Sequence, residues 1–114
     1  MSKISFDGIG QEVATFEAGS GVAAGHVVKL TDNGKVGKCA EGDAFCGMAL
    51  NVRGGCAGVQ LRGFVTLNCA GSETVGYATL CADGQGGVKK ATTGGVSVLV
   101  VSVDAEAKTC VVFL

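Results

Sequence analysis

The stretch that decides the fold runs from Gly58 to Cys69, with the sequence GVQLRGFVTLNC. Alternate positions form an apolar set that we expect to face the core: Val59, Leu61, Val65, Leu67 and Cys69. The positions between them form a set that we expect to face water: Gln60, Arg62, Phe64, Thr66 and Asn68. This period of two, rich in β-branched and aromatic residues, predicts one half-buried strand over residues 58–69. Within it, Gly63 indicates a bulge or a close approach of another backbone segment.

The composition of the whole chain favours more strands of this kind. A length of 114 residues is typical of one domain. The chain has 20 glycines and no proline. The glycines stand singly or in pairs between short apolar runs, and so predict turns between many short strands. No segment has a convincing helical pattern, and we expect an all-β protein.

Two halves of the chain share one order of expected elements. The turn Asp32-Asn33-Gly34, a strong hairpin signal, has a glycine-rich counterpart at residues 83–87. In each half the turn is followed by a return strand, a buried strand and a further strand. Corresponding elements of the two halves lie about fifty residues apart in the sequence. We therefore predict a single β domain over residues 11–114. It should be a compact small barrel or β-clip-like sandwich, with a pseudo-twofold internal repeat of about residues 21–69 and 72–114.

Residues 1–10 have a different character and predict an extended amino-terminal arm. They place Ile4, Phe6 and Ile9 among polar residues and glycines, without helical spacing. Two interpretations stand side by side. The segment is a disordered tail, as many termini are, or an arm whose apolar side chains become ordered on a partner.

The charges exclude several classes of partner. The formal net charge is −1, and the charged residues are scattered. Because nucleic-acid binding normally needs a basic patch, we expect no nucleic-acid partner. The longest apolar run, around residues 98–101, is far shorter than the roughly 20 residues of a membrane helix. With no signal-peptide pattern at the amino terminus, we expect a soluble chain made in the cytoplasm.

The six cysteines are widely and unevenly spaced: Cys39, Cys46, Cys56, Cys69, Cys81 and Cys110. Structural zinc sites usually pair ligands two to four residues apart, and this chain has no CxxC motif and one histidine, His26. A metal site is therefore not expected. Cytoplasmic synthesis disfavours disulfides. We expect free thiols that pack as small apolar side chains.

No motif points to catalysis. The chain lacks a GxSxG elbow, a phosphate-binding glycine loop and an HExxH helix. Its carboxylates fall mostly at expected turns, where aspartate is favoured because it bonds the backbone. We predict no enzymatic activity, no catalytic residues and no cofactor.

Several stretches resemble the tailed-phage capsid cement, or head decoration, proteins: AGHVVKL (24–30), DNGKV (32–36), CGMAL (46–50), GVQLRGFVTL (58–67) and VGYATL (75–80). In that family a Val-x-Val-x-Gly strand follows a glycine-led, valine-rich strand, and Leu61 stands here in place of the second valine. The resemblance extends over about residues 11–114. The six cysteines are a departure, because the family pattern does not require them.

The resemblance implies a non-enzymatic β protein that binds the outer surface of an assembled phage head and stabilises it, commonly as a homotrimer. Its partners would be the major capsid protein and itself. Its location would be the virion surface, and the host cytoplasm during assembly. We expect the arm residues Ile4, Phe6 and Ile9 to bind the capsid. Candidate residues for a subunit interface are Arg62, Phe64, Val112, Phe113 and Leu114.

Other interpretations remain open at this point. Plain solvent exposure is the alternative for Arg62. A small β module that binds a ligand or carbohydrate is the alternative function, although sugar sites usually display exposed aromatic side chains and this chain has only Tyr77 and five phenylalanines. A minor enzyme subunit is a third possibility, which the missing polar constellation disfavours.

Overall fold

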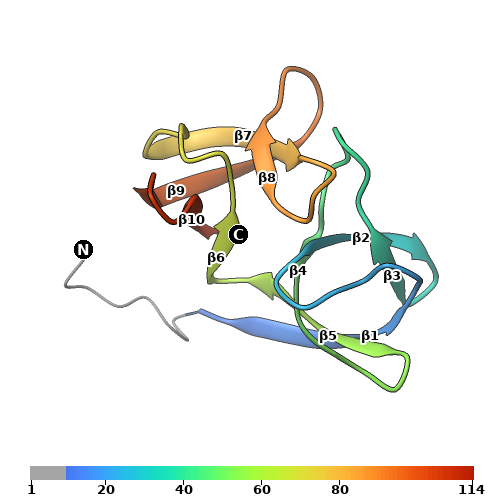
Figure 1. Cartoon of the computed structure of the whole chain (residues 1–114). Coiled ribbons are helices and arrows are strands. Elements are labelled where there is room, and N and C mark those ends of the chain that lie inside the picture. Colours follow the sequence, from blue (N-terminus) through green and yellow to red (C-terminus); the bar gives the residue numbers. More distant parts are fainter. Residues whose placement is uncertain (1–9) are drawn as a thin grey trace.

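A computed structural model describes residues 10–114, which form ten β-strands and, within that range, no helix (Figure 1). The first five strands are β1 (Glu12–Ala18), β2 (Val27–Asp32), β3 (Lys35–Lys38), β4 (Gly47–Arg53) and β5 (Cys56–Arg62). The other five are β6 (Phe64–Asn68), β7 (Gly76–Ala82), β8 (Val88–Lys90), β9 (Val96–Asp104) and β10 (Thr109–Phe113). The prediction of an all-β protein with a small barrel is confirmed.

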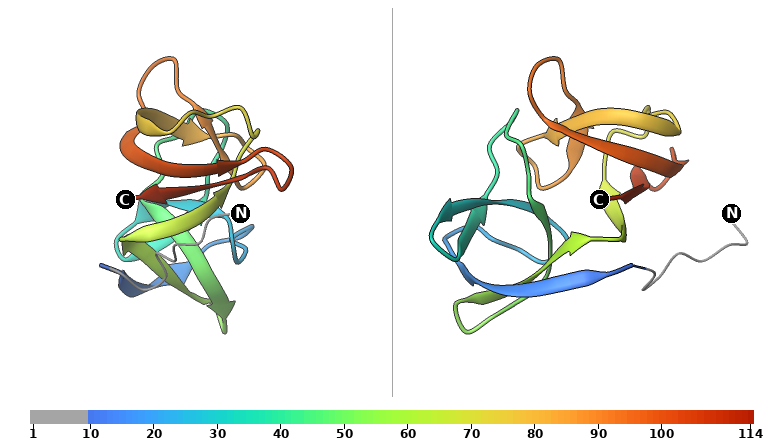
Figure 2. Two further views of the ribbon diagram at one scale, coloured as in Figure 1. Left: turned by 90° about the vertical axis from the view of Figure 1, so that its left-hand side faces the viewer. Right: turned by 180° about the vertical axis from the view of Figure 1, so that it is seen from behind.

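The strands divide into two sheets, which lie side by side in all three views (Figures 1 and 2). The first is a closed barrel in the order β1-β3-β2-β4-β5. It closes because β1 pairs on one side with β5 and on the other with β3, through Glu17–Lys35 and Ala18–Val36. The second is an open sheet in the order β6-β10-β9-β7-β8. The chain passes once from the barrel to the open sheet, between β5 and β6.

The two sheets repeat one pattern of strand pairing. In the barrel β2 pairs with β3 and β4, and β5 pairs with β4 and β1. In the open sheet β7 pairs with β8 and β9, and β10 pairs with β9 and β6. The expected pseudo-twofold repeat is therefore present, with β1 and β6 as counterparts. It divides the strands at Gly63, whereas the turn signals placed the division near residues 70–71 and left β1 outside the repeat.

The single strand predicted over residues 58–69 is wrong, because the chain breaks at Gly63. There φ is +99°, a conformation that residues with a side chain rarely adopt. A Cβ at this position would lie 2.8 Å from the carbonyl oxygen of Gly10 and 2.9 Å from Cα of Gln11. The Gly63 carbonyl also accepts a hydrogen bond from the Leu114 amide at 3.0 Å. The predicted close backbone approach is confirmed, and we call this place the crossing: Gly10–Gln11, Gly63 and Leu114.

The side chain of Gln60 holds the break in place. It was expected to face water, but only 2% of its surface is exposed. Its Nε2 donates hydrogen bonds to the carbonyl oxygens of Arg62, at 3.1 Å, and Phe64, at 2.8 Å. Its Oε1 accepts one from Nε2 of Gln11 at 3.1 Å. A primary amide has two donor hydrogens, so one buried side chain bonds a backbone carbonyl on each side of Gly63.

The main core lies between the barrel and the open sheet. The barrel and its β3–β4 loop contribute Val27, Cys39, Phe45 and Met48 to it. The open sheet and the residue after β6 contribute the rest: Val65, Leu67, Cys69, Leu80, Ala82, Val88, Val98, Val100, Cys110 and Val112. A smaller cluster fills the barrel itself, with Val28, Val36, Ala49, Ala57 and Val59. Because the larger core is shared, the two sheets form one folding unit.

Substitution of Gly63 by alanine should destabilise the protein strongly. The positive φ alone costs roughly 1–2 kcal/mol for a residue with a side chain, and here the new Cβ would also collide with backbone atoms that cannot rotate away. We expect Gly63→Ala to lower the free energy of unfolding by more than about 2 kcal/mol in urea titrations.

Gly54 provides the matched control, because its φ is +59° and a Cβ there would meet no atom within 4 Å. Gly54→Ala should cost about 1 kcal/mol, the conformational part alone. Equal losses in the two variants would show that contact at the crossing adds nothing.

Replacement of Gln60 by leucine should also destabilise the fold. Leucine keeps much of the volume but removes both donors, and so leaves the carbonyls of Arg62 and Phe64 without this partner. The expected loss is about 1–3 kcal/mol in the free energy of unfolding. Gln85→Leu, at an exposed turn, is the control and should change it by less than about 0.5 kcal/mol.

Candidate functional site

A continuous line of large apolar side chains crosses the outer face of the open sheet. Tyr77 on β7 pairs with Leu99 on β9, Leu99 pairs with Phe113 on β10, and Phe113 pairs with Phe64 on β6. Directly paired residues of antiparallel strands carry their side chains on the same face. These four residues form what we call the apolar row. It crosses three gaps between strands, about 14 Å at roughly 4.8 Å each.

The apolar row is open to solvent for much of its length. The Tyr77 side chain is 83% exposed and that of Phe113 is 39% exposed, while Leu99 and Phe64 are half-buried. Val75, just before β7, is a further exposed apolar residue. The rings of Phe64 and Phe113 pack with centroids 4.9 Å apart and planes tilted by 53°. Isolated exposed apolar residues are common, but a contiguous line of them marks an interaction surface.

The row gathers half of the aromatic residues of the chain. The sequence has five phenylalanines, one tyrosine and no tryptophan, and three of these six residues belong to the row. Aromatic side chains are enriched at protein interfaces, because they bury a large area at a small cost in conformational entropy. Within the described residues, the row is therefore the best candidate for a functional surface.

The predicted interface residues fall in different environments. Phe64 and Phe113 belong to the row. Arg62 is exposed at the end of β5, with its Nε 3.6 Å from a carboxylate oxygen of Glu12 on β1. Val112 is fully buried in the main core, because successive side chains of β10 alternate between faces, so it takes no part in this surface. Leu114 is half-buried and packs against the same core.

The predicted arm residues Ile4, Phe6 and Ile9 lie outside the described residues. The described chain begins at Gly10, which is next to the row. A Cβ at Gly10 would lie 3.8 Å from Cε1 of Phe113. The amino-terminal segment is thus attached at the Phe64–Phe113 end of the apolar row.

Sequence reasoning did not select Tyr77, Leu99 or Val75 for a functional surface. Alternation along residues 76–80 could have placed Tyr77 on the face away from the core. That it lies in line with Phe113 depends on the register of two strand pairs, β7–β9 and β9–β10, which no local signal specifies. The row is a product of tertiary pairing.

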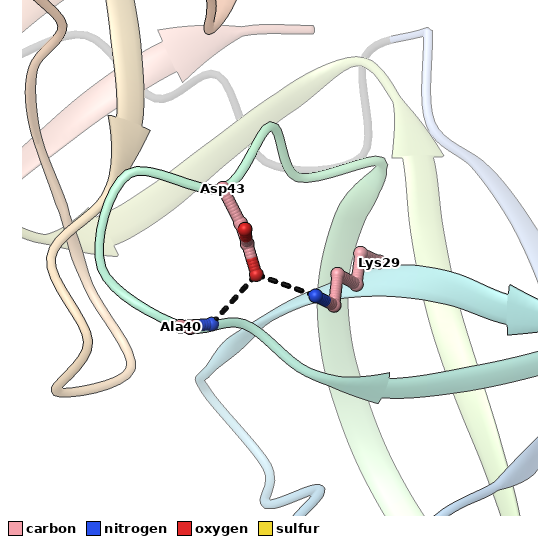
Figure 3. Close-up of polar contacts among 3 residues, drawn as sticks. All are labelled: Lys29, Ala40 and Asp43. Carbon is pink, nitrogen blue, oxygen red and sulfur yellow. Dashed lines mark hydrogen bonds and ion pairs between the residues drawn. The ribbon is translucent and has the colours of Figure 1, made fainter.

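A second notable feature is a group of polar contacts around the β3–β4 loop, where the barrel meets the open sheet; we call it the polar seam, and it comprises Lys29, Glu41, Asp43 and Lys89. The β3–β4 loop reaches the open sheet, where the Gly42 amide donates to the Ala82 carbonyl and the Ala82 amide donates to the Asp43 carbonyl, both at 2.9 Å. The Asp43 carboxylate accepts from Lys29 Nζ at 2.6 Å and from the Ala40 amide at 2.8 Å (Figure 3). Lys89 on β8 is paired with Glu41.

These contacts lower the pKa of both acidic groups, Glu41 and Asp43. The hydrogen bond from Lys29, followed by that from the Ala40 amide, holds the pKa of Asp43 below its ordinary value. The hydrogen bond from Lys89 does the same to the pKa of Glu41. An open hollow of about 440 Å³ borders the seam, lined by Lys38, Cys39, Ala40, Glu41, Asp83, Gly84 and Gln85. The Asp83 carboxylate on its rim accepts hydrogen bonds from the Gln85 and Gly87 amides, so it acts as a turn cap.

The thiols have the properties of packing groups. All six cysteines are free, and all but the half-buried Cys46 and the exposed Cys56 are buried. Burial raises the pKa of Cys39 to about 11 and that of Cys110 to about 12. A nucleophilic cysteine needs a lowered pKa, so these two remain protonated at neutral pH. Among residues 10–114, no group of three His, Cys, Asp or Glu side chains is placed to hold a metal ion.

Comparison with known proteins found no protein that is similar in sequence. The sequence matches no protein-family model and no curated protein. In the part of the chain that the structure describes, no helix is long and apolar enough to span a membrane.

The polar seam predicts a specific dependence of stability on pH. Because the pKa of Asp43 is lowered on folding, its contribution to stability is complete above its ordinary pKa of about 4 and is lost as the pH falls through the lower folded value. Asp43→Asn should therefore unfold at lower urea concentration than the wild type at pH 7, with a smaller difference at pH 3.

Glu106→Gln is the control, since it removes the same charge from the exposed β9–β10 turn. Its urea midpoint should follow that of the wild type at both pH values. A difference between Asp43→Asn and the wild type that is as large at pH 3 as at pH 7 would contradict the role of the Asp43 carboxylate.

Proposed function

We propose that this protein is a non-enzymatic capsid decoration protein, which binds the outer surface of an assembled tailed-phage head and stabilises it as a homotrimer. The observation that carries the proposal is the apolar row, with the amino-terminal segment attached at its end. The residues that resemble decoration proteins support it. They lie on β2, the β2–β3 turn, β4, β5–β6 and β7, and so on the framework of both sheets.

The size and character of the row suit a contact that is repeated many times. Full burial of one large apolar side chain contributes roughly 1.5–3 kcal/mol before the costs of association. A row of four partly exposed side chains therefore makes a modest interface. Copies held together in a trimer on a regular lattice bind with much higher avidity than one copy does, because each further contact is intramolecular.

A module that binds carbohydrate is the second candidate, and the exposed aromatic residues of the row are the observation in its favour. A sugar ring stacks on a flat aromatic platform flanked by polar groups. The two phenylalanine rings are tilted by 53° to each other, and only Tyr77 is mostly exposed. The two phenylalanine rings already pack against each other, with centroids 4.9 Å apart, so they form one uneven apolar surface. Such a surface suits contact with protein side chains better than a sugar stacked flat across both rings.

Cosedimentation with expanded heads of the phage or prophage that carries this gene tests the proposal. The wild-type protein should pellet with the heads and reach saturation. Tyr77→Ser together with Phe113→Ser should weaken binding by at least about tenfold, because the two most exposed side chains of the row are lost.

Leu30→Ser is the matched control, because Leu30 is 57% exposed on β2 of the barrel, outside the row. It should bind like the wild type. Failure of the wild-type protein to pellet with its own heads would reject the function. Binding that all three substitutions leave unchanged would reject the row as the contact surface.

A further inference from the structure

The turn between β2 and β3 contains an asparagine that is followed by glycine, Asn33-Gly34, and both residues are exposed. Within residues 10–114, neither the side-chain amide of Asn33 nor the backbone amide of Gly34 makes a hydrogen bond. The φ of Gly34 is +64°, and a Cβ there would meet no atom within 4 Å. An amide carbon and a free backbone nitrogen are therefore neighbours in a turn with open space around it.

Such neighbours can react with each other without an enzyme. The backbone nitrogen of Gly34 loses its proton and attacks Cγ of Asn33, so that an N–Cγ bond forms and the Cγ–Nδ2 bond breaks. Nδ2 takes up a proton and leaves as ammonia, and a cyclic succinimide remains. Water then opens the ring at Cγ to give aspartate, or at the main-chain carbonyl to give isoaspartate, whose main chain runs through Cβ and Cγ. Glycine favours ring closure because no side chain obstructs its nitrogen.

The chain has two further asparagines, Asn51 and Asn68, which are also exposed but lack this arrangement. Asn51 is in β4, before the β-branched Val52, and its side-chain oxygen accepts a backbone hydrogen bond at 3.3 Å. Asn68 ends β6, and the amide of the next residue, Cys69, already donates a hydrogen bond at 2.9 Å. Exposure therefore does not distinguish Asn33 from the other two, whereas the free amide and the glycine do.

The β2–β3 turn also takes part in closing the barrel. The carbonyl of Gly34 accepts a hydrogen bond from the amide of Glu17 on β1 at 2.9 Å. The β1–β3 pairing that closes the barrel is short, and consists of Glu17–Lys35 and Ala18–Val36. Isoaspartate would add one carbon atom to the main chain immediately before Gly34. It would therefore displace the carbonyl to which Glu17 donates.

We propose that Asn33 deamidates spontaneously through a succinimide, and that the isoaspartyl product loosens the β1–β3 pairing that closes the barrel. The aspartyl product keeps the length of the main chain and adds only a negative charge, in a turn that already contains Asp32. Barrel closure thus weakens with the age of the molecule. This inference concerns the free protein and does not rest on the proposed function.

Peptide mapping by mass spectrometry of the full-length protein, during incubation in buffer, tests the reaction. Tryptic cleavage places the three asparagines in separate peptides. Asn33 should convert at least about ten times faster than Asn51 and Asn68, because reaction within a strand requires the strand to open. The rate should rise with pH, since the attacking amide must lose its proton. Equal rates at the three asparagines would overturn the proposal.

Hydrogen exchange at the Glu17 amide tests the effect on the barrel. In the isoaspartyl fraction, identified with an isoaspartate methyltransferase, this amide should exchange at least about ten times faster than in the unmodified protein. Freshly purified Asn33→Asp is the matched control, because it has the same charge without the additional main-chain carbon, and it should exchange like the wild type.

Asn33→Gln, incubated for the same time, is the control for ageing, because glutamine forms the corresponding larger ring far more slowly. Its Glu17 amide should keep the exchange rate of the fresh protein. An unchanged rate in the isoaspartyl fraction, or an equal increase in Asn33→Asp, would reject the effect on barrel closure. Neither experiment uses phage heads, so both outcomes are independent of binding to a capsid.

Discussion

At Gly63 the chain passes from a closed barrel into an open sheet, and there it contacts Gly10, Gln11 and Leu114. The backbone of Gly10–Gln11 leaves no room for a side chain at residue 63, and the amide of Leu114 bonds to its carbonyl. A break in a strand frees carbonyl groups that neighbouring strands would otherwise bond, and a buried carbonyl without a donor is costly. Gln60 removes that cost with one amide group. The position of the open sheet relative to the barrel depends on the hydrogen bonds that Gln60 makes on both sides of Gly63.

Contacts away from the crossing also hold the two sheets together. The main core is built by side chains of both sheets, and the β3–β4 loop bonds the backbone of Ala82 on β7. The two halves are therefore joined at the crossing, through the core and at the polar seam. They repeat one pairing pattern, yet only the barrel closes. β6 and β8 remain the edges of the open sheet, and the face that they bound carries the apolar row.

Local features of the sequence were enough to predict the all-β class and the inward direction of Val65 and Leu67, because alternation and turn residues act over short distances. They also indicated the close approach at Gly63. They could not predict that Gln60 is buried, since its role depends on a strand break three residues away. They missed β1 as the counterpart of β6, because those strands share no turn signal. The apolar row could not be predicted for a different reason. Tyr77, Leu99 and Phe113 become neighbours only through the register of the paired strands.

The crossing also determines where a fused domain or an inserted peptide can be accommodated. Both the first described residue and the last residue of the chain lie at one place, beside the row, as the neighbouring contacts of Gly10 and Leu114 with Gly63 show. A domain fused to the carboxyl terminus would emerge next to the surface that we assign to binding and would crowd it. The β4–β5 turn lies at the far end of the barrel in Figure 1. A peptide inserted there would point away from the row, so that turn, rather than the position after Leu114, is the natural place to display a foreign peptide.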